Sequence, residues 1–140
     1  MSHKISSSAL FEVINRKANN KGADFTIKSI KTGKDYTYKI SRSQYKDNWY
    51  THIKVETEYL KFVRLGTYYN GAIRHKGELV NTPSAIAIAY VLAKVELMVF
   101  NALDNQIDIM HTGNCLVCGK TLTDANSIEI GLGPICRGGK

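Results

Sequence analysis

Three cysteines and one histidine near the end of the chain have the types and spacing of a metal site. Cys115 and Cys118 form a CxxC pair, seventeen residues separate Cys118 from Cys136, and His111 lies four residues before Cys115. A CxxC turn lets two thiolates converge on one ion, and three cysteines with one histidine are a common tetrahedral set for structural Zn²⁺. The pattern therefore predicts zinc as a cofactor, held by His111, Cys115, Cys118 and Cys136.

The fourth ligand is inferred from the position of the cysteines in the chain. Only four residues follow Cys136, and none of them ligates zinc well, so the fourth ligand comes from upstream or from outside the chain. His111 is the nearest candidate, although a surface histidine before a glycine turn would look the same. The HxE of zinc deaminases and the HExxH of zinc proteases are both absent from the sequence, which favours a structural ion over a catalytic one.

The remaining histidines do not indicate an enzyme. His52 and His75 lie among the predicted strands, without a nucleophile elbow, a phosphate-binding loop or a pair of carboxylates beside them. They are interpreted as surface histidines, and the chain is predicted not to be an enzyme.

The segment from Cys115 to Cys136 resembles an uncharacterised domain family common in bacteriophages and related mobile elements. The family pattern is approximately CxxCGRxLTxPxSIxxGIGPxC, from which this chain departs by Lys120 for Arg, Ala125 for Pro and Leu132 for Ile. The stretch from Phe25 to Gly71 is also similar to a segment that often accompanies the signature. The resemblance implies a small phage-type zinc protein in the cytoplasm of a bacterial host, and it brings no known activity.

Positive charge is concentrated in the first half of the chain. The net charge is +7, and between Arg16 and Lys76 there are 14 Lys or Arg but only 5 Asp or Glu. Tyrosines and Trp49 lie among these cations, a mixture typical of sheet surfaces that bind nucleic acid. Soluble lysines and core aromatics would give the same composition. The predicted nucleic-acid contacts are Lys28, Lys31, Lys34, Lys39, Arg42, Lys46, Trp49, Lys54, Lys61, Arg64 and Arg74.

The cysteine pattern and the apolar runs of the sequence indicate where in the cell the protein is expected. The cysteines are odd in number and clustered, and no signal peptide is recognisable, which favours a reducing cytoplasm. The longest apolar run, Ala85 to Phe100, is interrupted by Lys94 and Glu96 and is shorter than the roughly twenty residues that a bilayer requires. No membrane span is predicted.

The hydrophobic pattern predicts an α+β fold. A helix over residues 9–19 follows the serine caps Ser6 to Ser8, and a hairpin joins residues 25–30 to 36–40. Further strands are expected at 49–55, 59–69 and 71–74, with a polar loop at 41–48. Thr82 and Pro83 begin a helix that is apolar on two faces and runs to about Asn101.

The predicted architecture is an antiparallel sheet of four or five strands packed on that long buried helix. Residues 1–105 form the α+β unit, and residues 106–140 form a zinc knuckle that begins with a short strand at 106–110. The expected function is binding of nucleic acid or of a nucleic-acid-processing complex. The alternative is an inhibitor or adaptor that binds a host protein, for example to counter a bacterial immune nuclease. The oligomeric state is open.

Overall fold

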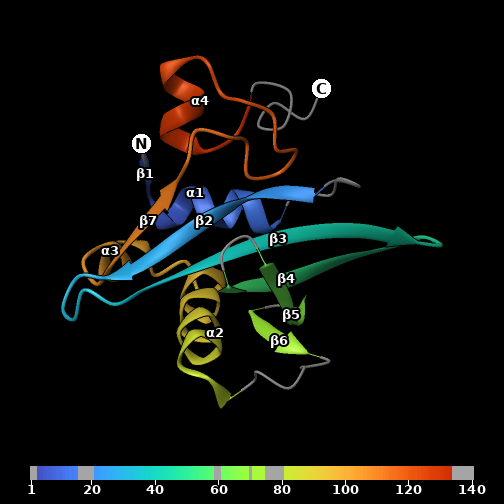
Figure 1. The fold of residues 1–140 in the computed structure, drawn as a ribbon, viewed down its shortest axis with the longest axis horizontal. Helices are drawn as coiled ribbons and strands as arrows, with labels where there is room; N and C mark the ends of the chain where they lie inside the picture. Colours follow the sequence, from blue (N-terminus) through green and yellow to red (C-terminus); the bar gives the residue numbers. More distant parts are fainter. Residues whose placement is uncertain (1–2, 16–20, 59–60, 70, 75–80, 134–140) are drawn as a thin grey trace.

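The computed structural model describes residues 3–15, 21–58, 61–69, 71–74 and 81–133 (Figure 1). Within these residues, seven strands form one antiparallel sheet in the order β1-β7-β2-β3-β4-β5-β6. The strands are β1 (His3–Ile5), β2 (Lys21–Ser29), β3 (Asp35–Tyr45), β4 (Asn48–Glu58), β5 (Lys61–Tyr69), β6 (Ala72–Arg74) and β7 (Ile107–His111). The helices are α1 (Ser7–Ile14), α2 (Pro83–Glu96), α3 (Phe100–Asp104) and α4 (Ala125–Ile130).

One face of the sheet carries the core. Alternate residues of the central strands are buried there, because successive side chains of a strand point to opposite faces. Helices α1, α2 and α3 pack together over this face, where Tyr38 of β3 donates its hydroxyl to the Ser84 carbonyl of α2 at 2.7 Å. The larger buried apolar residues of β2 to β5 and β7 are Phe25, Ile27, Tyr38, Ile40, Ile53, Val55, Leu65, Ile107 and Ile109. We call this the helix face of the sheet.

The predicted fold class is wrong in the size of the sheet and in the role of the long helix. The sheet has seven strands in place of four or five, because β1 and β7 join the predicted strands, and β7 had been assigned to the separate knuckle. Helix α2 ends at Glu96, since Met98 takes a positive φ of 58° and the chain restarts as the separate α3. Helix α2 is buried on one side only: Ile86 is 60% exposed and Tyr90 is 46% exposed.

Other local predictions had mixed outcomes. The hairpin at residues 25–40 and the Thr82 cap before Pro83 are confirmed, and so is the short strand near 106–110. Ser6 caps α1, which ends at Ile14 with Asn15 as its C-cap; residues 16–19 of the predicted helix lie outside the described residues. The prediction of a polar loop at 41–48 is wrong. Strands β3 and β4 form a long hairpin across these residues, and the chain turns only at Lys46 and Asp47. Figure 1 shows this hairpin extending beyond the other strands.

The C-terminal residues join the sheet rather than following it. Strand β7 pairs with both β1 and β2, so the division placed at residue 106 falls inside a single sheet. Beyond β7, residues 112–133 form a compact turn and α4, which lie at the opposite end of the molecule from α2 (Figure 1). We call residues 112–133 the C-terminal lobe. No helix in the described ranges is long and apolar enough to cross a membrane.

Gly22 in β2 is the point where the C-terminal lobe meets the sheet. A methyl group on Gly22 would collide with the carbonyl oxygen of Leu116 and would lie 2.7 Å from that of Ile40. Both neighbours are backbone atoms, which cannot move aside as a flexible side chain can. Leu116 is buried and its N–H donates to the Gly131 carbonyl at 2.9 Å, so its backbone is also fixed from within the lobe.

We therefore predict that Gly22→Ala lowers the free energy of unfolding by about 3 kcal/mol, the upper part of the range for overpacking. The matched control is Gly33→Ala: Gly33 has a φ of +76° with nothing within 4 Å, so only backbone strain of about 1 kcal/mol is expected. Urea denaturation of both variants measures the difference. Equal losses would contradict the close packing of the lobe on β2.

Candidate functional site

The second face of the sheet is not covered by α1, α2 or α3. Its side chains come from the strand positions between the buried core residues, and they are exposed or half-buried except for Ser41, which is buried. On β3 to β6 this face carries Lys39, Ser41, Ser43, Tyr50, His52, Lys54, Glu56, Phe62, Arg64, Thr67, Tyr69, Ala72 and Arg74. We call it the open face.

Three cations lie in one row across the open face. The strand register places Lys39 of β3 opposite Lys54 of β4, and Lys54 opposite Arg64 of β5. Like charges that face each other directly across strands repel, so this row lowers the stability of the sheet. Asp24 of β2 stands opposite Lys39 at one end of the row, and no acidic residue separates Lys54 from its two neighbours. We call Lys39, Lys54 and Arg64 the basic row.

A bulge in β5 creates the last member of this row. Ile53 pairs with Gly66 while the next residue, Lys54, pairs with Arg64, so Leu65 is an extra residue in β5. A bulge lets two neighbouring residues oppose one on the partner strand. Leu65 is thereby buried on the helix face and Arg64 reaches the open face; regular pairing would have put Leu65 opposite Lys54. The bulge therefore exchanges an apolar side chain for a cation at this position.

Aromatic rings accompany the cations on the open face. The Lys39 ammonium lies 4.8 Å from the centre of the Phe62 ring, and the Arg74 guanidinium carbon lies 5.2 Å from that of Tyr69. Tyr50 and Tyr69 are exposed. Rings and cations at such distances attract each other, and the rings stay available for stacking on a ligand. Phe62 is absent from the predicted contacts, because its face can be assigned only once the register of β5 is known.

His52 lies beside the basic row on the open face. Its Nε2 is 3.3 Å from the Ser43 hydroxyl, and its Nδ1 is 3.2 Å from the Thr67 hydroxyl. Burial lowers the pKa of His52 below its usual value, and the nearby Arg64 and Lys54 lower it further. The neutral form of His52 is therefore favoured, and negative charge that offset Arg64 and Lys54 would raise its pKa.

The other predicted contacts are not all on this surface. Arg42 is only 5% exposed on the helix face and donates to the Val13 carbonyl of α1, which corrects its prediction as a surface contact. Trp49 is half-buried and also belongs to the helix face. Lys28 is on the open face but stands between Asp35 and Asp108, and Asp108 also binds Lys4 at 2.7 Å.

The remaining cations lie at the ends of hairpins. Lys31 and Lys34 are in the β2–β3 turn and line a cavity on the side of α2. Lys46 is at the tip of the β3–β4 hairpin, and Lys61 begins β5. The predicted contacts that lie together on the open face of β3 to β6 are therefore Lys39, Lys54, Arg64 and Arg74.

The CxxC turn places hydrogen-bond donors around the Cys115 sulfur. Cys115 is fully buried, and its Sγ accepts the Gly133 N–H at 3.4 Å. Burial raises the pKa of this thiol, but the N–H groups of Cys118, Gly133 and Val117 and the Cys118 thiol outweigh it, so the net pKa is lowered. Gly119 has a φ of 82°, and its N–H donates to the Cys115 carbonyl at 2.8 Å to close the turn. The turn favours a thiolate, the form in which cysteine binds metal.

His111 is oriented by two backbone bonds. It is 1% exposed at the end of β7, where its Nε2 bonds the Ile128 carbonyl at 2.7 Å and its Nδ1 accepts the Gly113 N–H at 3.0 Å. The Nε2–H therefore belongs to the carbonyl of α4, and the lone pair is on Nδ1. Histidines that bind metal usually donate their other N–H in this manner. A metal at Nδ1 would take the place of the Gly113 N–H.

The predicted metal site is only partly within the described residues. Cys136 lies outside them, so its distance from the other sulfurs is not defined. Within the described ranges no three His, Cys, Asp or Glu side chains form a metal-binding cluster. The Cys115 thiolate environment and the Nδ1 lone pair of His111 fit zinc chemistry, and these are the features that the structure supplies.

Comparison with known proteins finds similarity in the C-terminal region. A model described as a family of unknown function (DUF6011) matches residues 109–139, which include His111 and all three cysteines. No curated protein and no solved structure matches the chain. The open face of β3 to β6 lies outside the matched region.

Proposed function

We propose that the protein binds single-stranded nucleic acid on the open face of β3 to β6. The observation that carries the proposal is the basic row, in which Lys39, Lys54 and Arg64 oppose each other on three adjacent strands. Neighbouring strands are about 5 Å apart, so the three cations crowd within about 10 Å. A phosphodiester backbone that crosses these strands would neutralise the three charges and remove the repulsion that is present in the free protein.

The rings favour a single strand over a duplex. Phe62 and Tyr69 lie beside Lys39 and Arg74, and aromatic side chains on a sheet bind bases by stacking only where the bases are unpaired. Among the residues that the structure describes, the face presents side chains from strands and no helix that could enter a groove of a duplex. Stacking and phosphate contacts depend little on sequence, so weak base preference is expected.

We also propose that Zn²⁺ stabilises the C-terminal lobe through Cys115, Cys118, Cys136 and the Nδ1 atom of His111. The amide groups around Cys115 and the fixed tautomer of His111 support this assignment. The ion would crosslink the end of β7 to the segment after α4 and so hold the lobe against Gly22. The cytoplasm of a bacterium that hosts a phage is the proposed setting, following the resemblance of the Cys115–Cys136 segment.

The nucleic-acid proposal is tested by removing the basic row. We expect Lys39→Gln/Lys54→Gln/Arg64→Gln to weaken binding of a fluorescent single-stranded oligonucleotide. It should also reduce the slope of log affinity against log salt by about 2, since each lost phosphate contact contributes roughly 0.7. The charge-matched control is Lys31→Gln/Lys34→Gln/Lys46→Gln, which should leave the slope unchanged.

The stability of the same two variants provides a second test of the basic row. The basic-row variant should be at least as stable as the unaltered protein in urea denaturation, because it removes like charges that face each other. Weaker binding with retained stability excludes loss of folding as the cause. Equal loss of binding in both triple variants would show general charge attraction and overturn the site.

Binding should depend on pH through His52. Arg64 and Lys54 contribute to the lowered pKa of His52, so a bound polyanion raises that pKa by neutralising them. Affinity should therefore increase as the pH falls below about 6.5, the usual histidine pKa, where the complex takes up a proton. His52→Gln should flatten the change in oligonucleotide affinity between pH 8 and pH 5.5. A profile that is identical in the variant would contradict the placement of the phosphates beside His52.

The zinc proposal predicts one zinc ion per chain by elemental mass spectrometry of purified protein. Cys118→Ser removes a half-buried sulfur without creating a large cavity, and it should reduce the zinc content. A chelator should lower the melting temperature of the unaltered protein but not that of the Cys118→Ser variant. His111→Gln keeps an amide donor for the Ile128 carbonyl but removes Nδ1, so zinc should be lost to the chelator faster. Zinc-free protein with an unchanged melting temperature would contradict the site.

A further inference from the structure

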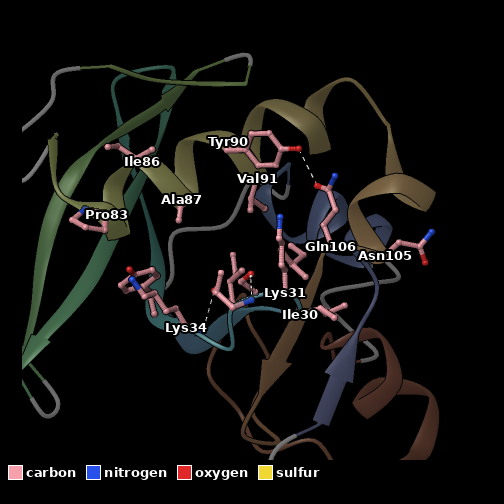
Figure 2. Close-up of a pocket in the computed structure, with 15 residues that line it drawn as sticks. Ile30, Lys31, Lys34, Pro83, Ile86, Ala87, Tyr90, Val91, Asn105 and Gln106 are labelled. Carbon is pink, nitrogen blue, oxygen red and sulfur yellow. Dashed lines mark hydrogen bonds between the residues drawn. The ribbon is translucent and has the colours of Figure 1, made fainter.

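A cavity of about 970 Å³ lies on the helix side of the sheet, away from the open face. It is bounded by the β2–β3 turn, by α2 and by the segment from Asn105 to Ile107, as Figure 2 shows. This volume is at the upper end of the range for small-molecule sites in proteins. The cavity is thus large enough to take an organic ligand of moderate size.

The lining of the cavity is mainly apolar. Buried Ile27, Val91 and Ile107 form its base, where sheet and helix meet. Ile30, Ile86 and Tyr90 belong to the same lining and leave 51%, 60% and 46% of their surfaces exposed. Apolar side chains gathered around a concavity lose contact with water when an apolar body fills it, which favours binding.

The charge at the cavity has one sign. Its lining residues include Lys31 and Lys34 but no Asp or Glu. Figure 2 shows both lysines on the β2–β3 turn, across the cavity from the α2 residues Ile86, Ala87 and Val91. An anionic group on a ligand would therefore be attracted to this side of the cavity, and a cationic group would be repelled.

The turn that carries the lysines is preformed. The Ser29 hydroxyl accepts the Thr32 N–H at 3.2 Å, and the Thr32 hydroxyl accepts the Lys34 N–H at 3.3 Å. The Gly33 N–H also donates to the Ser29 carbonyl at 2.8 Å. Tyr90 of α2 donates its hydroxyl to the Gln106 side-chain oxygen at 2.9 Å, and the Ile30 N–H donates to the Gln106 carbonyl at 3.0 Å, so α2 is tied to the turn side of the cavity. Little ordering of the site is needed when a ligand enters.

We propose that this cavity binds a small amphipathic anion, with a hydrocarbon body between α2 and the sheet and a carboxylate at Lys31 and Lys34. The size of the cavity, its apolar base and its uniform positive charge all match such a ligand. The site is separate from the open face and from the cysteines. It does not depend on nucleic-acid binding or on zinc.

The test uses decanoate and decylammonium, which share a ten-carbon chain and differ in the sign of the head group. Titration calorimetry is done below the concentrations at which either forms micelles. We expect decanoate to bind at one site at least tenfold more tightly than decylammonium. Amide NMR shifts on decanoate addition should concentrate at residues 29–34, 86–91 and 105–107. Absence of decanoate binding, or equal affinity for the two probes, overturns the proposal.

Variants separate the apolar and charged parts of the site. Lys31→Gln/Lys34→Gln should weaken decanoate binding about fivefold and reduce the preference over decylammonium by at least the same factor, as expected for two exposed charge pairs. Lys46→Gln/Lys61→Gln removes the same charge elsewhere and should change neither. Ala87→Trp should fill the cavity and abolish binding of both probes. Ile86→Ser, at an exposed position, should weaken both if Ala87→Trp fails to fold.

The location of the shifts distinguishes the cavity from the basic row. Decanoate could also approach Lys54 and Arg64 as a simple anion. If the amide shifts cluster around these residues, or if the basic-row variant weakens decanoate binding more than Lys31→Gln/Lys34→Gln does, the assignment to the cavity is contradicted.

Discussion

The pairing of β3, β4 and β5 is the constraint on which the rest of the molecule depends. Tyr38, Ile40, Ile53, Val55 and Leu65 must all face the helices to form the core, and the period of two in a strand then sends the residues between them to the other side. Lys39, Lys54 and Arg64 occupy those positions. The packing of the hydrophobic core therefore forces these three cations together, and its stabilising free energy offsets their repulsion. This cluster of like charges, which is present in the protein without a ligand, is the feature on which the proposed binding of a polyanion depends.

Sequence periodicity predicts the parts of this arrangement that are local. The alternation around Ile53 and Val55, the Gly33 turn and the Thr82–Pro83 helix start each depend on a few neighbouring residues, and they were predicted correctly. Arg42 shows the limit of the method. Its charge suggested a surface position, but its strand parity matches that of Tyr38 and Ile40, and its guanidinium reaches α1 beneath the sheet.

Non-local features could not be predicted in this way. The bulge at Leu65 shifts the parity of β5, and only the pairing with β4 reveals it. Strand β7 comes from the end of the chain to lie between β1 and β2, and no local pattern indicates that choice of partner. Helix α2 has two apolar sides in sequence, yet only one is buried; the other includes Ile86 and Tyr90 of the cavity. The feature mistaken for core is thus part of a candidate binding site.

The two sides of the sheet present different chemistry, because the open face is basic and aromatic and the cavity is apolar with two lysines. The most direct test of the central claim is lysine acetylation footprinting by mass spectrometry, with and without a single-stranded oligonucleotide. The account predicts that the oligonucleotide protects Lys39 and Lys54 while Lys31, Lys34 and Lys46 react as before. Protection of Lys31 and Lys34, or uniform protection of all five, would contradict it.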